Sequence, residues 1–379
     1  MSQAPCWKNL DWKKELTNNV RSVDQLKAYV AFDPDEEAAL RQVAALHPIN
    51  IPRYYLSLIN FDDPRDPIRR MCFPSADELV VAGAMGATTT DPYGDDKHDK
   101  GNGVLHKYDC TALLITTERC AMHCRHCFRR RMVGHSPRET LRQFAGALDY
   151  IAAHKEINNV ILSGGDPLTL DTPVLETMLE GLASLDHVAF ARIGTRVPVT
   201  YPLRLFDQSL TDALRRFAAR KGLYIATHYN HPREITPTSA AAIERIRLCG
   251  AVVNNQAVLL RGVNDSADTL AELMNGLLAI GVNPYYVYQC MPVARVRHHF
   301  QLPLKEGVAL VDQARAMLSG YGKRFKYIIG HDIGKLEICG RDGDTLILKQ
   351  LHARSGHAEQ ASRMLLLPLD DALGWVDFD

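Results

Sequence analysis

The sequence lacks several features that mark membrane, secreted and nucleic-acid-binding proteins. No run of apolar residues approaches the length of a membrane span. The first residues, 1–8, carry no apolar core of the kind that directs secretion. Charge is balanced, because Lys plus Arg and Asp plus Glu both number 44, so no bulk charge points to nucleic acid or to a membrane surface. There is also no repeat of fixed period and no low-complexity segment.

A disulfide framework is missing as well. The chain has nine cysteines, an odd number, and six of them stand alone in the sequence, at positions 6, 72, 110, 249, 290 and 339. Isolated cysteines are typical of a reducing compartment, whereas small secreted domains pair theirs at close spacings. Together with the absent secretion signal, this pattern predicts a cytoplasmic protein that contacts neither membrane nor nucleic acid.

The other three cysteines form one group. Cys120, Cys124 and Cys127 have the spacing Cys-x3-Cys-x2-Cys and follow the apolar run at 112–115 directly. Three thiolates on one loop can hold three irons of a [4Fe-4S] cluster and leave the fourth iron open for a small ligand. That arrangement is used to cleave S-adenosylmethionine (SAM) reductively and release a carbon radical. A zinc site completed by a histidine of the same loop is the alternative, and the three-cysteine spacing favours the open cluster over it.

Apolar and amphipathic segments alternate from residue 111 onward. Apolar runs lie at 111–116, 159–163, 188–194, 222–227, 251–260 and 283–289, and helical stretches lie at 136–154, 172–185, 207–220, 237–249, 267–280 and 305–319. Six strand–helix units in succession predict an α/β fold with a parallel sheet curled by right-handed crossovers. Because a closed barrel has eight such units, we expect a partial, TIM-like (βα)6 barrel over residues 111–320.

Two regions flank the predicted barrel. The N-terminal region, residues 1–110, is expected to be mostly helical and to end in a loop or lid at 91–103, which is rich in Asp, Gly and Lys. The C-terminal region, residues 321–379, carries an alternating run at 345–349 that suits a terminal strand. These regions and the barrel give three expected domains.

Polar or glycine residues follow the predicted strands. Gly164, Gly165 and Asp166 follow the second strand, Arg192 ends the third, and Gln256 lies in the fifth. Active sites of barrels lie at the carboxyl ends of the strands, so this convergence predicts an enzyme site. A glycine pair alone is more simply a strand-to-helix turn. Beside an open cluster, however, it can bring backbone close to a ligand, and we expect the Gly-Gly-Asp segment to bind SAM together with Arg192 and Gln256.

Two cationic side chains are further candidates, although most lysines and basic triplets are ordinary surface residues. Lys335 follows an apolar strand and a glycine turn at 327–334. Burial lowers the pKa of a lysine, which lets it form a Schiff base with pyridoxal phosphate (PLP). Arg129 opens a basic triplet, 129–131, at the expected mouth of the barrel, where an arginine fork can hold a substrate carboxylate.

Several segments together resemble one family. They are residues 120–131, 161–166, 227–232, 255–265 and 284–290, with 54–59 and 63–67 in the N-terminal region. From about residue 7 to about residue 350, the chain resembles the radical SAM lysine 2,3-aminomutase family. The resemblance implies a partial (βα)6 barrel with a [4Fe-4S] cluster, SAM and PLP. It also implies an isomerase that moves an amino group between C2 and C3 of a small-molecule amino acid, a reducing protein such as flavodoxin or ferredoxin as partner, and a homo-oligomer.

The resemblance also implies roles for individual residues. It assigns the three clustered cysteines to the iron–sulfur cluster, Asp166 and Gln256 to SAM, Arg129 to the substrate α-carboxylate and Lys335 to PLP. Lys107 stands where the family has the first of two arginines that serve the PLP phosphate, and a threonine takes the second position. A radical SAM enzyme without PLP therefore stays open as an alternative.

The positions that set substrate choice depart from the lysine-specific enzymes. Those enzymes place two aspartates around the distal ammonium of lysine, and here the matching residues are Met291 and Ile328. Asp332 lies close enough in sequence to compensate in part, and Arg295 is offered near the same pocket. A buried ammonium without a carboxylate partner is costly. We therefore expect a substrate with a neutral or acidic side chain, such as glutamate, with free lysine or a protein lysine as the alternative.

Overall fold

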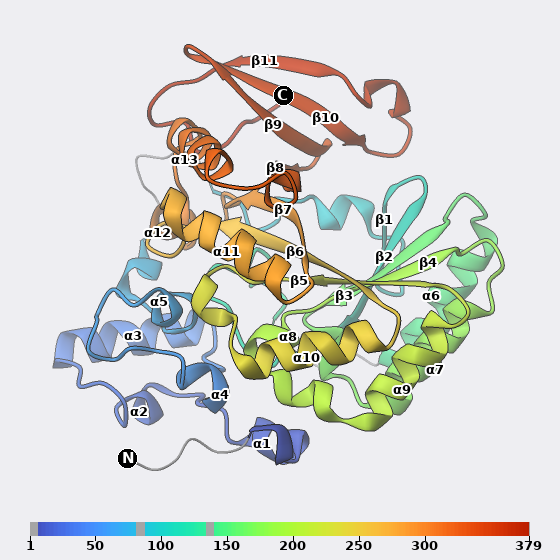
Figure 1. The fold of residues 1–379 in the computed structure, drawn as a ribbon, viewed down its shortest axis with the longest axis horizontal. Helices are drawn as coiled ribbons and strands as arrows, with labels where there is room; N and C mark the ends of the chain where they lie inside the picture. The colour runs from blue at the N-terminus through green and yellow to red at the C-terminus, as the bar shows by residue number, and fades with distance from the viewer. Residues whose placement is uncertain (1–6, 81–87, 134–139, 379) are drawn as a thin grey trace.

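Within the part of the chain that the structure describes, the strands form a single sheet with 11 strands in the order β1 to β11 (Figure 1). The computed structural model describes residues 7–80, 88–133 and 140–378. Strands β2 to β8 run parallel to one another, β1 pairs antiparallel with β2, and β8 to β11 continue the sheet antiparallel. The strands are β1 (Val104–Tyr108), β2 (Thr111–Thr117), β3 (Asn159–Gly164), β4 (Phe190–Gly194), β5 (Gly222–Thr227), β6 (Val252–Leu259), β7 (Asn283–Gln289), β8 (Lys326–His331), β9 (Gly334–Asp342), β10 (Thr345–Ala353) and β11 (Met364–Pro368).

Helices alternate with the parallel strands β2 to β7. They are α6 (Thr140–Ala153), α7 (Thr172–Ala183), α9 (Gln208–Ala218), α10 (Pro237–Leu248), α11 (Ala267–Ala279) and α13 (Leu304–Ala316). The predicted α/β fold, a partial TIM-like (βα)6 barrel, is therefore confirmed. Short helices that the periodicity missed, among them α8 (Val197–Thr200) and α12 (Arg297–Phe300), lie in the connections. The first predicted helix began at 136, and its part at 136–139 lies outside the described residues.

Side chains alternate along the parallel strands between fully buried and half-buried. On β3, Val160 and Leu162 are fully buried, whereas Ile161 is half-buried and is in register with half-buried Arg192 and Tyr224 on β4 and β5. Because residues two apart face the same side of a strand, the buried set packs against the helices. The half-buried set faces the interior of the curved sheet, which is therefore open, unlike the filled interior of a closed eight-stranded barrel.

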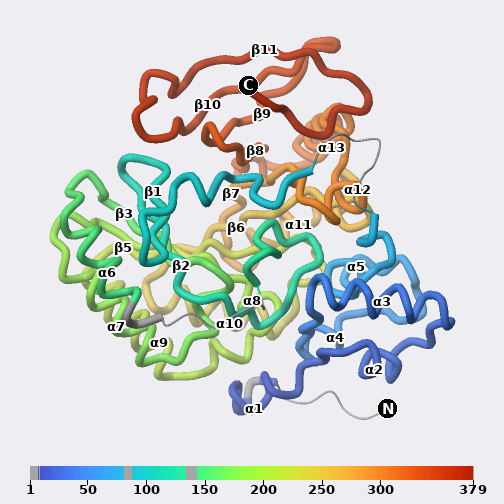
Figure 2. Tube along the Cα trace, turned by 180° about the vertical axis from the view of Figure 1, so that it is seen from behind, coloured from blue at the N-terminus to red at the C-terminus, as the bar shows by residue number. Residues whose placement is uncertain are grey.

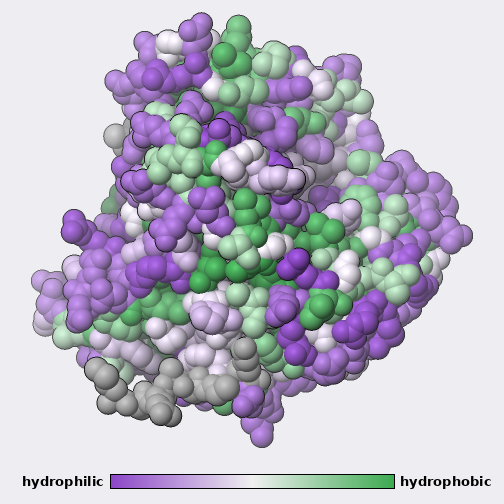
Figure 3. Space-filling model, in the orientation of Figure 1, coloured by the Kyte–Doolittle hydropathy of each residue, from purple (hydrophilic) through white to green (hydrophobic). Residues whose placement is uncertain are grey.

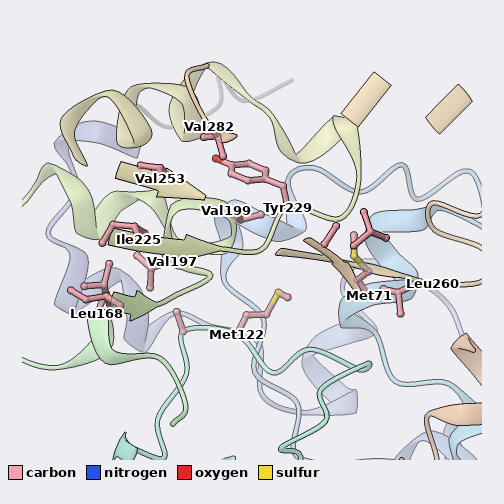
Figure 4. Packing of buried hydrophobic residues seen from close by; sticks show 14 of the residues in the cluster. Met71, Met122, Leu168, Val197, Val199, Ile225, Tyr229, Val253, Leu260 and Val282 are labelled. Atoms are coloured by element: carbon pink, nitrogen blue, oxygen red, sulfur yellow. The ribbon is translucent and has the colours of Figure 1, made fainter. Parts of the chain in front are cut away.

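The N-terminal region packs beside the barrel and shares its core. Its helices are α1 (Trp12–Thr17), α2 (Val23–Leu26), α3 (Pro34–Leu46), α4 (Arg53–Leu56) and α5 (Pro67–Cys72), at the lower left of Figure 1 and the lower right of the reverse view in Figure 2. Met71 of α5 packs near Leu260, which follows β6 (Figure 4). The predicted boundary at residue 110 falls between two paired strands, β1 and β2. The division into three domains stays a prediction.

The C-terminal strands extend the sheet beyond the barrel, at the top of Figure 1. A tight turn joins β8 to β9 at Gly334, where φ is +138° and an added Cβ would lie 1.8 Å from the carbonyl oxygen of His352. Only glycine fits such a position. The turn places Lys335 at the start of β9, opposite Gly330 of β8.

One face of the molecule shows how hydrophilic and hydrophobic residues are distributed. In the orientation of Figure 1, hydrophilic residues dominate the periphery and hydrophobic ones gather toward the middle (Figure 3). Within residues 7–80, 88–133 and 140–378, no helix has both the length and the apolar character needed to cross a bilayer.

Candidate active site

The three-cysteine loop leaves the carboxyl end of β2 and is held by the N-terminal region. The side-chain amide of Asn50 donates to the carbonyl oxygen of Cys120 at 3.0 Å, and the backbone carbonyl oxygen of Asn50 accepts from the backbone N–H of His123 at 2.9 Å. The N–H of Arg125 donates to the carbonyl oxygen of Met71 at 2.9 Å. Met122, inside the loop, is buried in the core (Figure 4). The N-terminal region thus fixes the loop conformation from outside the barrel.

A buried charge cluster braces the same loop. Glu78 accepts from Arg125 at 2.6 Å and from Arg130 at 2.7 Å, and all three side chains are buried. Burial alone would raise the pKa of Glu78, but the two guanidinium groups lower it overall. A carboxylate between two arginines offsets most of the cost of burying their charges.

The three thiols fit an iron–sulfur cluster. Burial raises the pKa of Cys127 to about 11, with the Cys124 thiolate adding to the rise, and burial likewise raises the pKa of Cys120. A bound metal provides the positive charge that such thiols need to ionise. In the described part of the chain, no three His, Cys, Asp or Glu side chains could hold a single metal ion. A four-iron cluster needs no such set, because each thiolate binds a different iron.

Gly164 and Gly165 bring the end of β3 against the start of the cysteine loop. The N–H of Gly165 donates to the carbonyl oxygen of Thr117 at 2.6 Å, and the N–H of Asp166 donates to that of Arg119 at 2.7 Å. A Cβ on either glycine would lie 2.3 Å or 2.1 Å from a backbone oxygen of this segment. The glycines therefore permit a close backbone contact, and their predicted contact with SAM stays a prediction.

Asp166 organises the end of the neighbouring strand. Its carboxylate accepts from the hydroxyl of Thr195 at 2.7 Å and from the backbone N–H of Arg196 at 2.7 Å. Burial raises the pKa of Asp166 to about 6, although these hydrogen bonds oppose the rise. Gln256 lies on the half-buried face of β6, and its backbone carbonyl oxygen lies 2.9 Å from Nδ1 of His228. Both residues lie at the predicted end of the barrel, and their SAM roles stay predictions.

Lys335 lies in a pocket of cations and aromatic rings. Burial lowers the pKa of Lys335 to about 7, and the positive charges of Arg192 and Lys107 add to the shift. Its ammonium nitrogen lies 5.1 Å from the ring centre of Tyr286. At neutral pH, about half of such a side chain is the neutral amine, which is the nucleophilic form.

Arg192 and Lys107 face this pocket from β4 and β1. Arg192 donates to Asn159 and, at 3.5 Å, to Thr111, at the amino ends of β3 and β2, whereas its buried Nε has no hydrogen-bond partner in the described part of the structure. Lys107 donates to the carbonyl oxygens of Tyr93 and His331 at 2.8 Å and 2.7 Å. Burial lowers the pKa of Lys107 to about 8. Arg192 therefore reaches the amino ends of the strands, and its predicted contact with SAM stays a prediction.

Arg129 is held at the mouth of the barrel by the predicted lid. Its Nε donates to Asp95 at 2.9 Å, and its Nη1 donates to the hydroxyl of Ser163 at 3.0 Å. Arg129 and Asp95 are both buried. Asp95 belongs to a short helical turn, Asp95–His98, within the segment expected to be a loop or lid. Asp95 thus orients the guanidinium, and the role of Arg129 toward a substrate carboxylate stays a prediction.

Of the four predicted specificity residues, only Asp332 carries a carboxylate, and its Oδ1 lies 3.5 Å from Nε2 of His98. Met291 lies beside Gly330, where an added Cβ would be 2.9 Å from the Met291 methyl, and Ile328 is fully buried on β8. Asp332 pairs with Lys97 of the lid at 2.5 Å. Arg295 has a left-handed backbone, φ 66°, and donates to the carbonyl oxygen of Glu78 at 3.2 Å.

The sequence did not predict the residues that support the predicted site residues through ion pairs and hydrogen bonds. Glu78 and Asp95 neutralise arginines near the cysteine loop, and Arg196 contacts the Cys124 sulfur at 2.8 Å. Arg196 did carry a signal, because it follows a predicted strand at the end where active sites form. Glu78 and Asp95 carried none, since acidic residues near turns are most often solvated.

The chain is similar to known proteins over most of its length. Residues 114–274, from β2 into α11, match the Radical SAM superfamily. A protein of Aquifex aeolicus (strain VF5), named provisionally as an L-lysine 2,3-aminomutase, is 36% identical over 365 residues, which cover 96% of each chain. The L-lysine 2,3-aminomutase of Clostridium subterminale is 37% identical, with 82% of this chain and 73% of that protein covered.

Another relative is named for a different substrate. The glutamate 2,3-aminomutase of Clostridioides difficile (strain 630) is 34% identical, with 83% of this chain and 72% of that protein covered. Among solved structures, a radical SAM methyltransferase from Sphaerobacter thermophilus has a TM-score of 0.43 and 18% identity, over 59% of this chain and 68% of that one.

Proposed function

This chain belongs to the radical SAM lysine 2,3-aminomutase family, and we propose that it moves the amino group of an L-α-amino acid between C2 and C3, giving a β-amino acid. The observation that carries the proposal is the setting of Lys335, whose ammonium lies 5.1 Å from the ring centre of Tyr286 on β7 and whose pKa is lowered by burial and by the charges of Arg192 and Lys107. The enzyme is an isomerase. Its cofactors are a [4Fe-4S] cluster, SAM and, we infer, PLP.

Different residues of the protein would hold the cluster, SAM and PLP. Bound cluster and SAM supply a carbon radical, and bound PLP supplies a conjugated ring that stabilises a radical beside the migrating nitrogen. Cys120, Cys124 and Cys127 would hold the cluster, and the Gly-Gly-Asp segment, which contacts the start of their loop, would position SAM. Lys335, as the neutral amine, would hold PLP covalently.

Three cations in one pocket support PLP. Arg192 and Lys107 lie close enough to Lys335 for their positive charges to lower its pKa. The unpaired Nε of Arg192 supplies a buried donor for a phosphate oxygen. Lys107 and Lys335 also lie over the rings of Tyr93 and Tyr286, at 3.8 Å and 5.1 Å from the ring centres, and such aromatic surfaces suit a flat cofactor.

Arg129 would orient the substrate through its α-carboxylate. Its Nε is occupied by Asp95 and its Nη1 by Ser163, so the guanidinium has one fixed orientation at the barrel mouth. A carboxylate binds best to a preoriented arginine fork, because less side-chain freedom is lost on binding. Asp95 keeps the site nearly neutral until the substrate carboxylate arrives.

The side chain of the substrate is the finer part of the proposal. Met291 and Ile328 are apolar, so neither offers a partner to a distal ammonium, and Asp332 is already paired with Lys97 through Oδ2 and lies 3.5 Å from His98 through Oδ1. We therefore propose a neutral or acidic side chain, with glutamate the first to test, as in the relative from Clostridioides difficile. Lysine, free or within a protein, is the second candidate, because the relatives from Aquifex aeolicus and Clostridium subterminale are named for it.

A panel of amino acids tests the function. The reconstituted protein is incubated with SAM, dithionite and one amino acid at a time, and β-amino acids are identified by chromatography and mass spectrometry. We expect a β-amino acid from glutamate or a neutral amino acid. Lysine turned over far faster than every other amino acid would overturn the substrate assignment, and 5′-deoxyadenosine without any β-amino acid would overturn the reaction. A reducing protein partner, a homo-oligomer and the cytoplasmic location stay predictions.

Met291→Asp is expected to shift the preference toward lysine. A carboxylate at this position gives the distal ammonium a charged hydrogen-bond partner worth about 1.5–3 kcal/mol, so kcat/KM for lysine should rise about 10- to 100-fold. Met291→Asn is the matched control, because it has the same shape without the charge. Equal lysine turnover by the two variants would show that Met291 does not border the substrate side chain.

Covalent loading of pyridoxal onto Lys335 is expected to depend on pH with a midpoint near 7. The neutral amine is reactive, so loading should rise as pH increases through the lowered pKa of Lys335, about 7. Arg192→Gln removes one positive charge that lowers this pKa, so the midpoint should move to higher pH. Borohydride trapping and mass spectrometry of the Lys335 peptide measure it. Pyridoxal, which lacks the phosphate, separates this effect from phosphate binding, and Arg215→Gln on the outer helix α9 should leave the midpoint unchanged.

A further inference from the structure

Arg196, which follows β4, is fixed between the cysteine loop and the ends of two other strands. Its backbone N–H donates to Asp166, beyond β3, at 2.7 Å, and its Nε donates to the carbonyl oxygen of His228, beyond β5, at 3.1 Å. The side chain is buried. The first bond fixes the backbone of Arg196, and the second holds its guanidinium against the end of β5.

The two terminal nitrogens of Arg196 have different partners. Nη1 donates to the sulfur of Cys124 at 2.8 Å, and Nη2 donates to Glu234 at 2.6 Å. In the loaded protein, that sulfur would be a thiolate bound to iron. The guanidinium therefore joins a cluster ligand to a carboxylate that lies on the opposite side of it.

Glu234 is buried and fully engaged. It accepts from the hydroxyl of Tyr55 at 2.6 Å, and its other oxygen accepts from the backbone N–H groups of Asn230 and His231 at 2.6 Å and 3.0 Å. It has no exposed surface. Its negative charge thus offsets part of the field that Arg196 exerts on the sulfur, and Tyr55 links this pair to the N-terminal region.

We infer that Arg196 is a positioning residue for the cluster, which holds the Cys124 sulfur and raises the reduction potential, and that Glu234 limits this rise. Reduction adds negative charge to the cluster, so a cation and an N–H donor on a ligand sulfur stabilise the reduced form. A carboxylate paired with the cation offsets part of its charge and therefore lowers the reduction potential. The inference rests on the cluster assignment alone and is independent of which amino acid rearranges.

A redox titration of the reconstituted cluster, followed by electron paramagnetic resonance without SAM or amino acid, tests it. Arg196→Gln should lower the ratio of reduced to oxidised cluster at a fixed potential about tenfold, equivalent to about 59 mV for a one-electron couple. Glu234→Gln should shift the potential in the opposite direction. Arg233→Gln, which removes the neighbouring arginine that pairs with Asp66, is the control and should leave the potential unchanged.

Opposite shifts support the inference, and unchanged potentials or shifts of the same sign overturn it. If Arg196→Gln fails to retain iron, Glu234→Gln decides, because a potential at or below that of the unmodified protein would contradict the role of the pair. Arg196→Lys keeps a cation and should recover part of the shift. Since no amino acid is present, failure of the aminomutase proposal would appear only in product assays.

Discussion

Lys335→Ala is expected to abolish amino-group migration, by at least about 10³-fold, while the cluster and SAM cleavage are retained. The reason is the position of Lys335, which starts β9 in the cationic pocket, whereas the cysteines lie on the loop after β2. The amine of lowered pKa is the attachment point that we propose for PLP. Removing the Lys335 amine should therefore stop amino-group migration without stopping SAM cleavage.

Two product assays on the same sample measure this separation. The β-amino acid reports migration, and 5′-deoxyadenosine formed with reductant reports SAM cleavage. Lys349→Ala is the matched control, because Lys349 lies on the neighbouring strand β10, opposite Glu337. Retained migration would remove Lys335 from the mechanism, and loss of both products would mean that the substitution acts through the fold.

Glu78→Gln is expected to destabilise the protein by about 3–5 kcal/mol, the usual cost of leaving buried charges without their partner. Here two guanidinium groups, those of Arg125 and Arg130, lose a carboxylate at 2.6 Å and 2.7 Å. Both arginines belong to the segment that carries the cysteines, so iron content after reconstitution should fall as well. Urea denaturation and iron analysis measure the two effects.

The control and the pH dependence sharpen this expectation. Asp77→Asn changes the adjacent residue, whose side chain is 59% exposed, and should cost no more than about 1 kcal/mol. Because the folded state lowers the pKa of Glu78, its stabilisation is complete above the ordinary glutamate pKa of about 4.3 and is lost as pH falls through the lower folded value. A loss below about 1 kcal/mol for Glu78→Gln would contradict the account of this cluster.

The barrel could be predicted from the sequence because its signals are local. Each strand is a contiguous apolar run and each helix an amphipathic one, so β2 to β7 and their helices fall within a few residues of the predicted segments. The cysteine motif is also contiguous, and its spacing indicates its chemistry without any tertiary information. The same holds for the lysine after the glycine turn at Gly334.

The contacts that support the site could not be predicted, because they join residues far apart in sequence. Arg125 and Glu78 are 47 residues apart, and Arg196 and Cys124 are 72 apart. The predicted lid at 91–103 did not reveal that Asp95 would hold Arg129. Arg192 was expected near SAM from its strand alone, but its side chain reaches toward the amino ends of β2 and β3. The order of the strands predicts at which end of the barrel a residue lies. The direction of its side chain depends on tertiary packing and could not be predicted.

The central claim is that nitrogen moves from C2 to C3 within one amino acid. Glutamate, or the amino acid turned over best, is supplied uniformly labelled with ¹³C and with ¹⁵N at the amino group, and the reaction is followed by NMR. We expect the one-bond ¹⁵N–¹³C coupling at C2 to disappear and an equal coupling to appear at C3. Coupling that stays at C2 for every amino acid tested, while 5′-deoxyadenosine accumulates, would contradict it.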